Sequence, residues 1–169
     1  MLTIGHSNRP LEEFLRMLHA HGVELVADVR KMPYSRKNPQ FSREALSSAL
    51  SAAGMEYRHM PGLAGFRQAR KDSPNTGWRN QSFRGYADYM QTAGFAKNLA
   101  ELAELGAART TAILCAESLP WRCHRSLIAD ALTARGVPVF HIMTAGKANL
   151  HKLPDFARVA DGWVTYPGG

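Results

Sequence analysis

Apolar and amphipathic segments alternate along most of the chain. Short apolar or alternating runs predict five strands, at Leu2–Ile4, Glu24–Val29, Met55–Met60, Thr111–Cys115 and Val137–Ile142. Apolar residues at helical spacing predict helices from Leu11 to the stop at Gly22, and at Arg43–Ala53, Asn80–Ala93, Phe95–Leu105 and Cys123–Ala134. This order predicts one α/β domain over residues 1–169, a Rossmann-like three-layer fold. We expect a mostly parallel sheet of about five strands with helices on both faces.

The C-terminal segment has a weaker pattern. Residues Leu153–Ala160 are compatible with a helix, and Trp163–Tyr166 with a short final strand at an edge. The helical region around Gly94 is expected to be a broken pair, because glycine weakens a helix interior.

Composition narrows the possible partners. The chain has 21 Lys and Arg against 14 Asp and Glu, a net charge of +7, which favours anionic partners such as phosphorylated small molecules or nucleic acid. No apolar run reaches the length of a membrane span, so we expect no membrane contact. The N-terminus lacks the pattern of a signal peptide, and the two cysteines suit a reduced compartment, so we expect a cytoplasmic protein.

Reactive side chains are concentrated between residues 111 and 128. A predicted strand ends in Cys115-Ala116-Glu117, and a predicted helix opens with Arg122-Cys123-His124-Arg125. In open parallel sheets, ligands bind at such turns after the carboxyl ends of strands. A helix N-terminus also favours anions and thiolates. The sequence therefore predicts a functional site here.

Other polar residues end the first two predicted strands and are expected at the same edge. We expect one cleft whose acid–base candidates are Glu117, Asp28, His124 and His6. The expected substrate-binding residues are Ser7, Arg30, Ser35, Arg122, Cys123 and Arg125, with the arginines as clamps for anions. The carboxylates could also bind Mg²⁺, although no metal ligand set is assigned and no cofactor is identified. An ion-paired network that only braces the loops is the alternative.

Two long loops, at residues 31–40 and 61–81, follow the second and third predicted strands. Both are rich in basic residues interleaved with the aromatic residues Tyr34, Phe41, Phe66 and Trp78. Cations for phosphates and rings for bases favour a nucleic-acid surface. Alternatively, the loops are solvated and their aromatic rings fold back onto the core.

The two cysteines receive different predictions. The segment between Cys115 and Arg122 contains Pro120 and no glycine, so it suits an anion cradle poorly, and we expect Cys115 to be a small buried apolar residue. Cys123 is the better thiolate candidate, because it lies near a helix start between Arg122 and Arg125. A zinc site from Cys115, Cys123 and His124 would have an unusual spacing.

Several segments in order resemble one known family. These are Thr3-Ile4-Gly5-His6-Ser7, Asp28-Val29-Arg30 with Pro33 and Ser35, Tyr86-Ala87-Asp88-Tyr89-Met90, and Cys115-Ala116-Glu117 leading to Cys123-His124-Arg125. The chain resembles a family of small prokaryotic proteins named domain of unknown function 488. The resemblance implies an α/β domain and supplies no activity. Leu63-Ala64-Gly65 departs from the family's usual Leu-Gly-Gly.

Three classes of function follow from these patterns. The first is an enzyme that acts on a phosphorylated or nucleotide-like substrate by acid–base or metal-assisted chemistry at an anion-binding cleft. The second is a nucleic-acid-binding module without catalysis. The third is a thiol-dependent redox or sulfur-transfer protein that uses Cys123.

Overall fold

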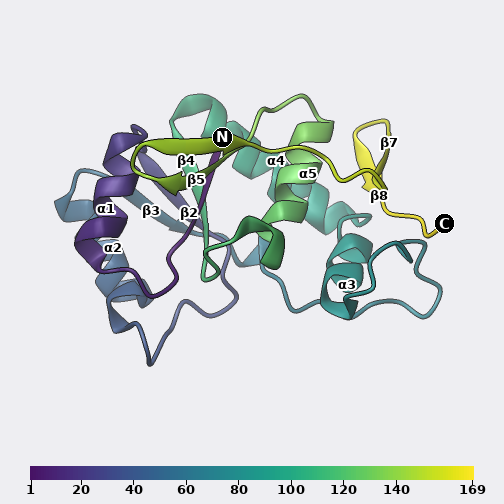
Figure 1. The fold of residues 1–169 in the computed structure, drawn as a ribbon, viewed down its shortest axis with the longest axis horizontal. Coiled ribbons are helices and arrows are strands. Elements are labelled where there is room, and N and C mark those ends of the chain that lie inside the picture. The colour runs from purple at the N-terminus through teal and green to yellow at the C-terminus, as the bar shows by residue number, and fades with distance from the viewer.

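The computed structural model describes residues 1–169, and strands alternate with helices along most of them (Figure 1). The strands are β1 (Leu2–Gly5), β2 (Leu25–Asp28), β3 (Glu56–His59), β4 (Thr111–Cys115), β5 (Phe140–Thr144), β6 (Lys147–Leu150), β7 (Arg158–Ala160) and β8 (Trp163–Thr165). The α-helices are α1 (Leu11–Ala20), α2 (Arg43–Ala52), α3 (Gln81–Tyr89), α4 (Ala93–Ala108) and α5 (Arg125–Ala134). Short 3₁₀ turns lie at Pro39–Phe41, Pro61–Leu63 and Pro120–Arg122.

The main sheet has six strands in the order β3-β2-β4-β1-β5-β6. The first five are parallel, and β6 pairs antiparallel with β5 at the edge. The predicted α/β fold with a mostly parallel sheet is confirmed. A separate two-stranded hairpin, β7-β8, packs through β8 against α5.

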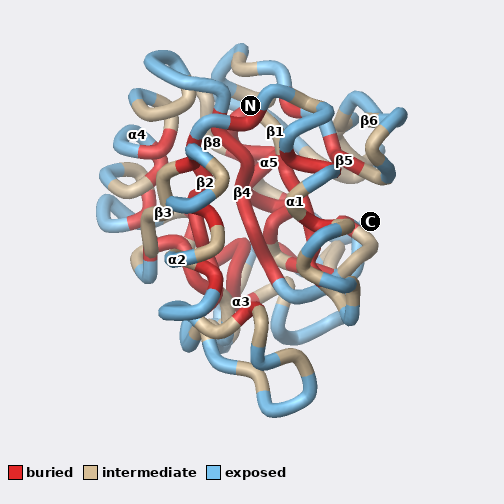
Figure 2. The backbone as a smooth tube through the Cα atoms, turned by 90° about the vertical axis from the view of Figure 1, so that its left-hand side faces the viewer, coloured by how far each residue is buried: buried red, intermediate tan, exposed pale blue.

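Two hydrophobic clusters make the three layers. Side chains alternate across the pleat, so Leu25 and Ala27 face one cluster whereas Val26 faces the other. The first cluster includes residues of α3, α4 and α5, and the second includes residues of α1 and α2. The buried backbone therefore runs through the middle of the molecule, as Figure 2 shows. None of the helices combines the length and apolar character needed to cross a lipid bilayer.

Two predicted features are wrong. Residues 153–157 form no helix, and Arg158–Ala160 is instead strand β7, which pairs with β8 around Gly162 at φ 80°. The helical break falls at residues 90–92, where Thr92 caps α4 by accepting from the Phe95 amide at 3.2 Å, and Gly94 lies inside α4. Strand β6 was not predicted from the sequence.

Candidate functional site

The carboxyl ends of the parallel strands place the loops that follow them on one side of the sheet. The pairing of β1 with β4 continues past the strands, because the His6 amide donates to the Cys115 carbonyl at 3.0 Å and the Ser7 amide to the Ala116 carbonyl at 2.9 Å. After these strands the chain turns to opposite faces, to α1 after β1 and to α5 after β4. Such a switch point is where open α/β sheets bind ligands.

Gly5 allows the closest packing at this point. A Cβ atom at position 5 would lie 1.6 Å from the Glu117 carbonyl oxygen and 2.7 Å from Arg125 Nη1. Only a glycine therefore lets β1 pass beneath the turn that follows β4.

Asp28 and Arg30 form a buried ion pair at the end of β2. Asp28 Oδ1 accepts from Arg30 Nε at 2.9 Å, and Oδ2 accepts from Arg30 Nη2 at 2.7 Å and from the Tyr57 hydroxyl at 2.5 Å. Asp28 is completely buried, and burial together with its hydrogen bond raises the pKa of Tyr57. Both Asp28 oxygens are occupied, so this carboxylate braces the loop and has no free oxygen for a substrate.

His6 extends this network. Its Nδ1 lies 2.7 Å from the Ser7 carbonyl oxygen and its Nε2 lies 3.3 Å from Arg30 Nη1. Burial lowers the pKa of His6 to about 4, so the ring is neutral at pH 7, with Nδ1–H donating to Ser7 and Nε2 accepting from Arg30. Its ring stacks on Phe41 at 4.5 Å, and Ser7 adopts a left-handed φ of 49°.

His124 connects three loops at the start of α5. Its Nε2 lies 3.2 Å from the Val29 carbonyl oxygen after β2, and its Nδ1 lies 3.5 Å from Cys123 Sγ. In the loop after β3, a Cβ at Gly65 would lie 3.0 Å from the same ring. Burial lowers the pKa of His124 to about 4, so it is a neutral bridge between these loops at pH 7.

Arg125 is not placed where the expected anion clamp would be. Its side chain is completely buried and donates to Thr3 Oγ1 at 3.2 Å, to Cys115 Sγ at 2.6 Å and to the Ser118 carbonyl at 2.9 Å. It also donates to the Glu117 carbonyl. Arg125 therefore shapes the turn after β4 from inside the protein.

Cys115 is buried in the apolar core, as the sequence predicts, but its acidity relative to Cys123 differs from the expectation. Burial by itself raises the pKa of the Cys115 thiol, but a hydrogen bond from Cys123 and the charge of Arg125 outweigh it and lower the pKa to about 7. The hydrogen bond to Cys115, with burial, raises the pKa of Cys123 well above its usual value. Cys115, and not Cys123, is thus the more acidic thiol, and both are buried.

The remaining expected site residues lie closer to solvent. Ser35 Oγ accepts from the Asn38 amide at 2.9 Å and so stabilises its own turn. Glu117 and Arg122 are exposed. The Glu117 side chain has no hydrogen-bond or ion-pair partner, whereas its carbonyl is held by Arg125 and Cys115. No group of three or more His, Cys, Asp or Glu side chains is arranged to hold a metal ion.

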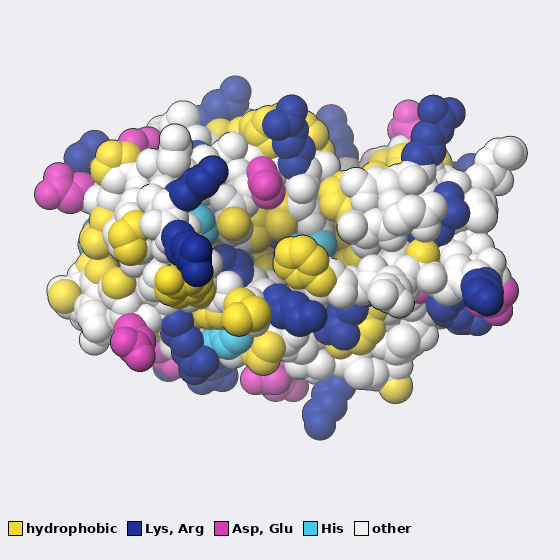
Figure 3. All heavy atoms as spheres, turned by 90° about the horizontal axis from the view of Figure 1, so that it is seen from below, with side chains coloured by type: hydrophobic (Ala, Val, Ile, Leu, Met, Phe, Trp, Pro, Cys, Tyr) yellow, Lys and Arg dark blue, Asp and Glu magenta, His cyan; other side chains and the backbone are white.

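The loops expose a mixed basic and apolar surface, seen from below in Figure 3. Its apolar members are 62–83 % exposed and come from the loops after β2, β3 and β4: Met32, Tyr34, Phe66 and Trp121. Its basic members are Lys31, Arg36, Lys37, Arg67 and Arg122. None of these five forms a salt bridge within the protein. Four are exposed, whereas Arg67 is half-buried, with its guanidinium 3.7 Å from the centre of the Tyr89 ring and its Nε donating to the Ala64 carbonyl. We call this set the carboxyl-edge surface.

The other two aromatic residues of these loops are packed inward. Phe41 is completely buried, and Trp78 lies against Phe83, Phe156 and Tyr166 at centroid distances of 5.1, 5.0 and 5.4 Å. Loop 61–81 is further held by Asp88, which accepts from the Arg70 amide and from the Ser73 and Asn75 side chains. The loop aromatics are therefore divided between surface and core.

A second polar network was not recognised in the sequence. It joins Thr3, His141, His151, Asp130 and Tyr166 in one buried chain of hydrogen bonds. The signal that could have revealed it is Asp130, a carboxylate inside the apolar run Leu127–Leu132 of α5, where it has to be paired.

Comparison with known proteins identifies the family and no activity. No curated protein and no solved structure matches the chain. A family model described as a domain of unknown function, DUF488, matches residues 10–132, which include all of β2 to β4 and most of α5. Since this match covers well over half of the sequence, the chain belongs to the DUF488 family.

Proposed function

We propose that the carboxyl-edge surface binds single-stranded nucleic acid. The observation that carries this proposal is the mixture of four exposed apolar side chains with four exposed basic ones and the half-buried Arg67 on three adjoining loops. Lys and Arg neutralise phosphates, and exposed rings stack on unpaired bases without regard to sequence. The net charge of +7 adds long-range attraction for a polyanion.

A single strand fits this surface better than a duplex. The rings of Tyr34, Phe66 and Trp121 can stack only on bases whose faces are free. The first turn of α5, which follows the Pro120–Arg122 turn of this surface, is built around the buried Arg125 and does not project as a recognition helix.

The test is fluorescence anisotropy with labelled DNA and RNA strands of about 20 nucleotides, and with the matching duplexes. Phe66→Ala and Trp121→Ala should each weaken binding by about 1–3 kcal/mol. Lys31→Ala and Arg122→Ala should each reduce the slope of log affinity against log salt by about 0.7.

Matched control variants lie away from the surface. Val159→Ala removes an exposed apolar side chain of β7, and Arg158→Ala removes a charge from the same strand. The proposal fails if the wild type does not bind single strands, or if the controls weaken binding as much as the surface variants do.

A second candidate is an enzyme that processes the bound strand with Glu117 as its acid or base. It is favoured by the free Glu117 carboxylate on a backbone fixed through its carbonyl by Arg125 and Cys115. Glu117→Gln should then lower turnover at least ~100-fold and leave binding intact. The measurement is strand cleavage or modification with and without Mg²⁺ or Mn²⁺, and unchanged turnover in the variant would exclude this role.

A further inference from the structure

A cavity of about 270 Å³ lies between the first turn of α5, the turn at Pro120–Arg122 and the β5-β6 hairpin. Its lining includes Trp121, Ser126, Met143, Asn149 and Lys152. We propose that this cavity binds a nucleoside monophosphate, either as a free nucleotide or as the phosphorylated end of a strand. For the strand end, the inference rests on the function proposed above.

The buried polar chain forms a rigid wall of the cavity, because His141 and His151 both line it. Thr3 Oγ1 lies 2.6 Å from His141 Nδ1, and His141 Nε2 lies 2.8 Å from His151 Nδ1. His151 Nε2 lies 2.6 Å from Asp130 Oδ1, and the Tyr166 hydroxyl donates to Asp130 Oδ2 at 2.6 Å. All four ring nitrogens are engaged inside the protein.

The hydrogen-bond partners set the direction of this chain. Asp130 can only accept when ionised, so His151 donates through Nε2–H and accepts at Nδ1. His141 then donates through Nε2–H and accepts at Nδ1 from the Thr3 hydroxyl. Burial, with the nearby His151, lowers the pKa of His141 to about 3, which agrees with a neutral ring. The wall therefore presents the neutral His141 ring to the cavity, and the carboxylate of the chain, Asp130, lies behind His151.

The charge on the remaining lining residues favours an anionic ligand. Lys152 lines the cavity, its ammonium group has no partner in the protein, and no acidic side chain lines the cavity. Asp130, behind His151, is covered by its two donors. An anionic group next to Lys152 would gain a charge-assisted hydrogen bond with no acidic competitor. Asn149 adds an amide for a further polar group of the ligand.

The apolar walls select a flat ring of limited size. Pro120, Trp121, Met143 and Leu150 face the same space. A Trp side chain offers a stacking face to a base, and the volume is near the lower end for ligand pockets, enough for one nucleotide unit. A ring on Trp121 and a phosphate at Lys152 together describe a nucleoside monophosphate.

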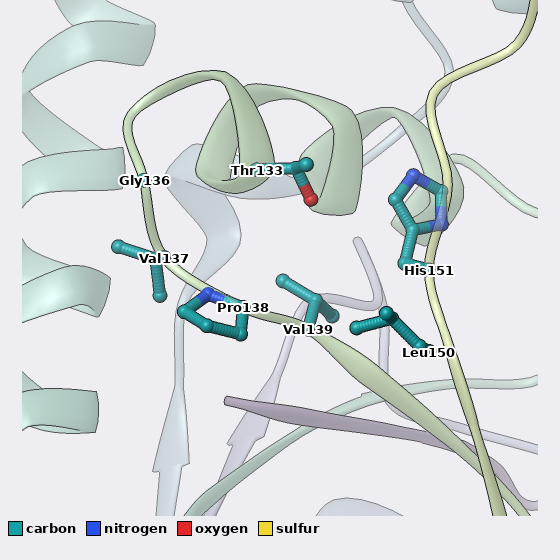
Figure 4. A pocket seen from close by; sticks show the side chains of 7 residues that line it. All are labelled: Thr133, Gly136, Val137, Pro138, Val139, Leu150 and His151. Atoms are coloured by element: carbon teal, nitrogen blue, oxygen red, sulfur yellow. The ribbon is translucent and has the colours of Figure 1, made fainter.

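The neighbouring cavity provides a contrast. It lies on the other side of Leu150 and His151, which line both, and Figure 4 shows its mostly apolar lining around Thr133. It has no Lys or Arg in its lining. The cavity that contains Lys152 also shares Trp121 with the carboxyl-edge surface, so a strand on that surface could end in it.

The first experiment is calorimetric titration of the full chain with the four nucleoside 5′-monophosphates, the matching nucleosides and inorganic phosphate. Lys152→Met should weaken nucleotide binding at least tenfold, the scale of a hydrogen bond to a charged group. Lys147→Met, which removes the same charge from β6 outside the cavity, should leave it unchanged. The proposal is overturned if no monophosphate binds, if phosphate alone binds equally well, or if both variants have the same effect.

The second experiment separates the two sources of the ligand and the two proposals. Linear strands with a 5′-phosphate, a 3′-phosphate or no phosphate are compared with a circular strand that has no end. A preference for a phosphorylated end that Lys152→Met abolishes identifies the strand end as the source. Mononucleotide binding without such a preference identifies the free nucleotide. If the circular strand binds but neither monophosphates nor phosphorylated ends are favoured, this inference fails and the carboxyl-edge proposal stands. If monophosphates bind but no strand does, the cavity proposal stands for the free nucleotide and the carboxyl-edge proposal fails.

Discussion

Two buried carboxylates, Asp28 at the end of β2 and Asp130 inside α5, are stabilised in different ways. Asp28 faces the Arg30 cation, with Tyr57 as a further donor. Asp130 contacts no Arg or Lys and accepts from His151 and Tyr166. Burial raises the pKa of Asp130, while the hydrogen bonds from His151 and Tyr166 oppose that effect. The first network is therefore stabilised mainly by an ion pair. The second is stabilised by a chain of hydrogen bonds in which each group donates to the next.

The largest expected effect is on pH dependence, because both networks contain a neutral histidine. The pKa of His6 and of His124 is lowered to about 4 and that of His141 to about 3, against about 6.5 in the unfolded chain. A lowered pKa means that, below pH 6.5, the unfolded chain binds protons that the folded protein does not. Stability is therefore full above pH 6.5 and falls as the pH drops towards 4, by about 1.4 kcal/mol per pH unit for each histidine.

Urea unfolding between pH 7 and pH 5 measures this slope, above the range in which most carboxylates titrate. His141→Gln should reduce the slope of the unfolding free energy against pH by the contribution of one proton. The contribution of His6, in the Asp28 network, should remain. A stability that is flat over this range would show that the histidines are not held neutral in the folded protein.

The next effect separates the two carboxylates directly. Asp28→Asn keeps the shape of the side chain and leaves the Arg30 guanidinium buried without its counter-charge. Removing one partner of a buried pair should cost about 3–5 kcal/mol in the free energy of unfolding. Chemical denaturation at pH 7 gives this value, and a loss below 1 kcal/mol would contradict the charge-held description.

Asp130→Asn should be the milder of the matched substitutions. No buried cation is left behind, but the new amide can accept from only one of His151 and Tyr166 and meets the other with an N–H group. One unsatisfied buried group costs about 1–3 kcal/mol. If the same denaturation measurement gave a loss equal to that of Asp28→Asn, the distinction between the two networks would disappear.

The order of the elements was predictable because apolar periodicity depends on burial, which is complete along β2 and β4 and nearly so along β1. The edge strand β3 is half-buried, and the buried Met55 and Met60 at its two ends marked it in the sequence. The tail was missed, because Arg158–Ala160 pairs with Trp163–Thr165 in a local hairpin whose two-residue turn, Asp161-Gly162, has φ angles of 51° and 80°. An Asp-Gly pair between two short runs is a hairpin signal that the helical spacing concealed. Strand β6 is mostly exposed and only four residues long, so the alternation of Lys147-Ala148-Asn149-Leu150 was too short to identify it in the sequence.

The candidate site shows the same limit at the level of side chains. Asp28, Arg30 and His6 were expected at the carboxyl edge, and the structure brings them together there, but strand position does not say which polar atoms satisfy one another. Arg125 illustrates this best, because a helix-start arginine is expected to face a ligand and here donates to carbonyl groups of its own protein. The exposed loop residues could be identified by composition, whereas their separation from inward-facing Phe41 and Trp78 required the fold.

The absence of a side chain at Gly5 has a consequence for how sequences of this kind can vary. Any replacement would press against the Glu117 carbonyl and the Arg125 guanidinium at once, so no single substitution at this position can be absorbed by one neighbour moving. A lineage could leave glycine here only by moving the backbone of the turn after β4 together with the end of the Arg125 side chain. Amino-acid substitutions at position 5 should therefore be much rarer than in the exposed loops around it, whatever ligand those loops bind.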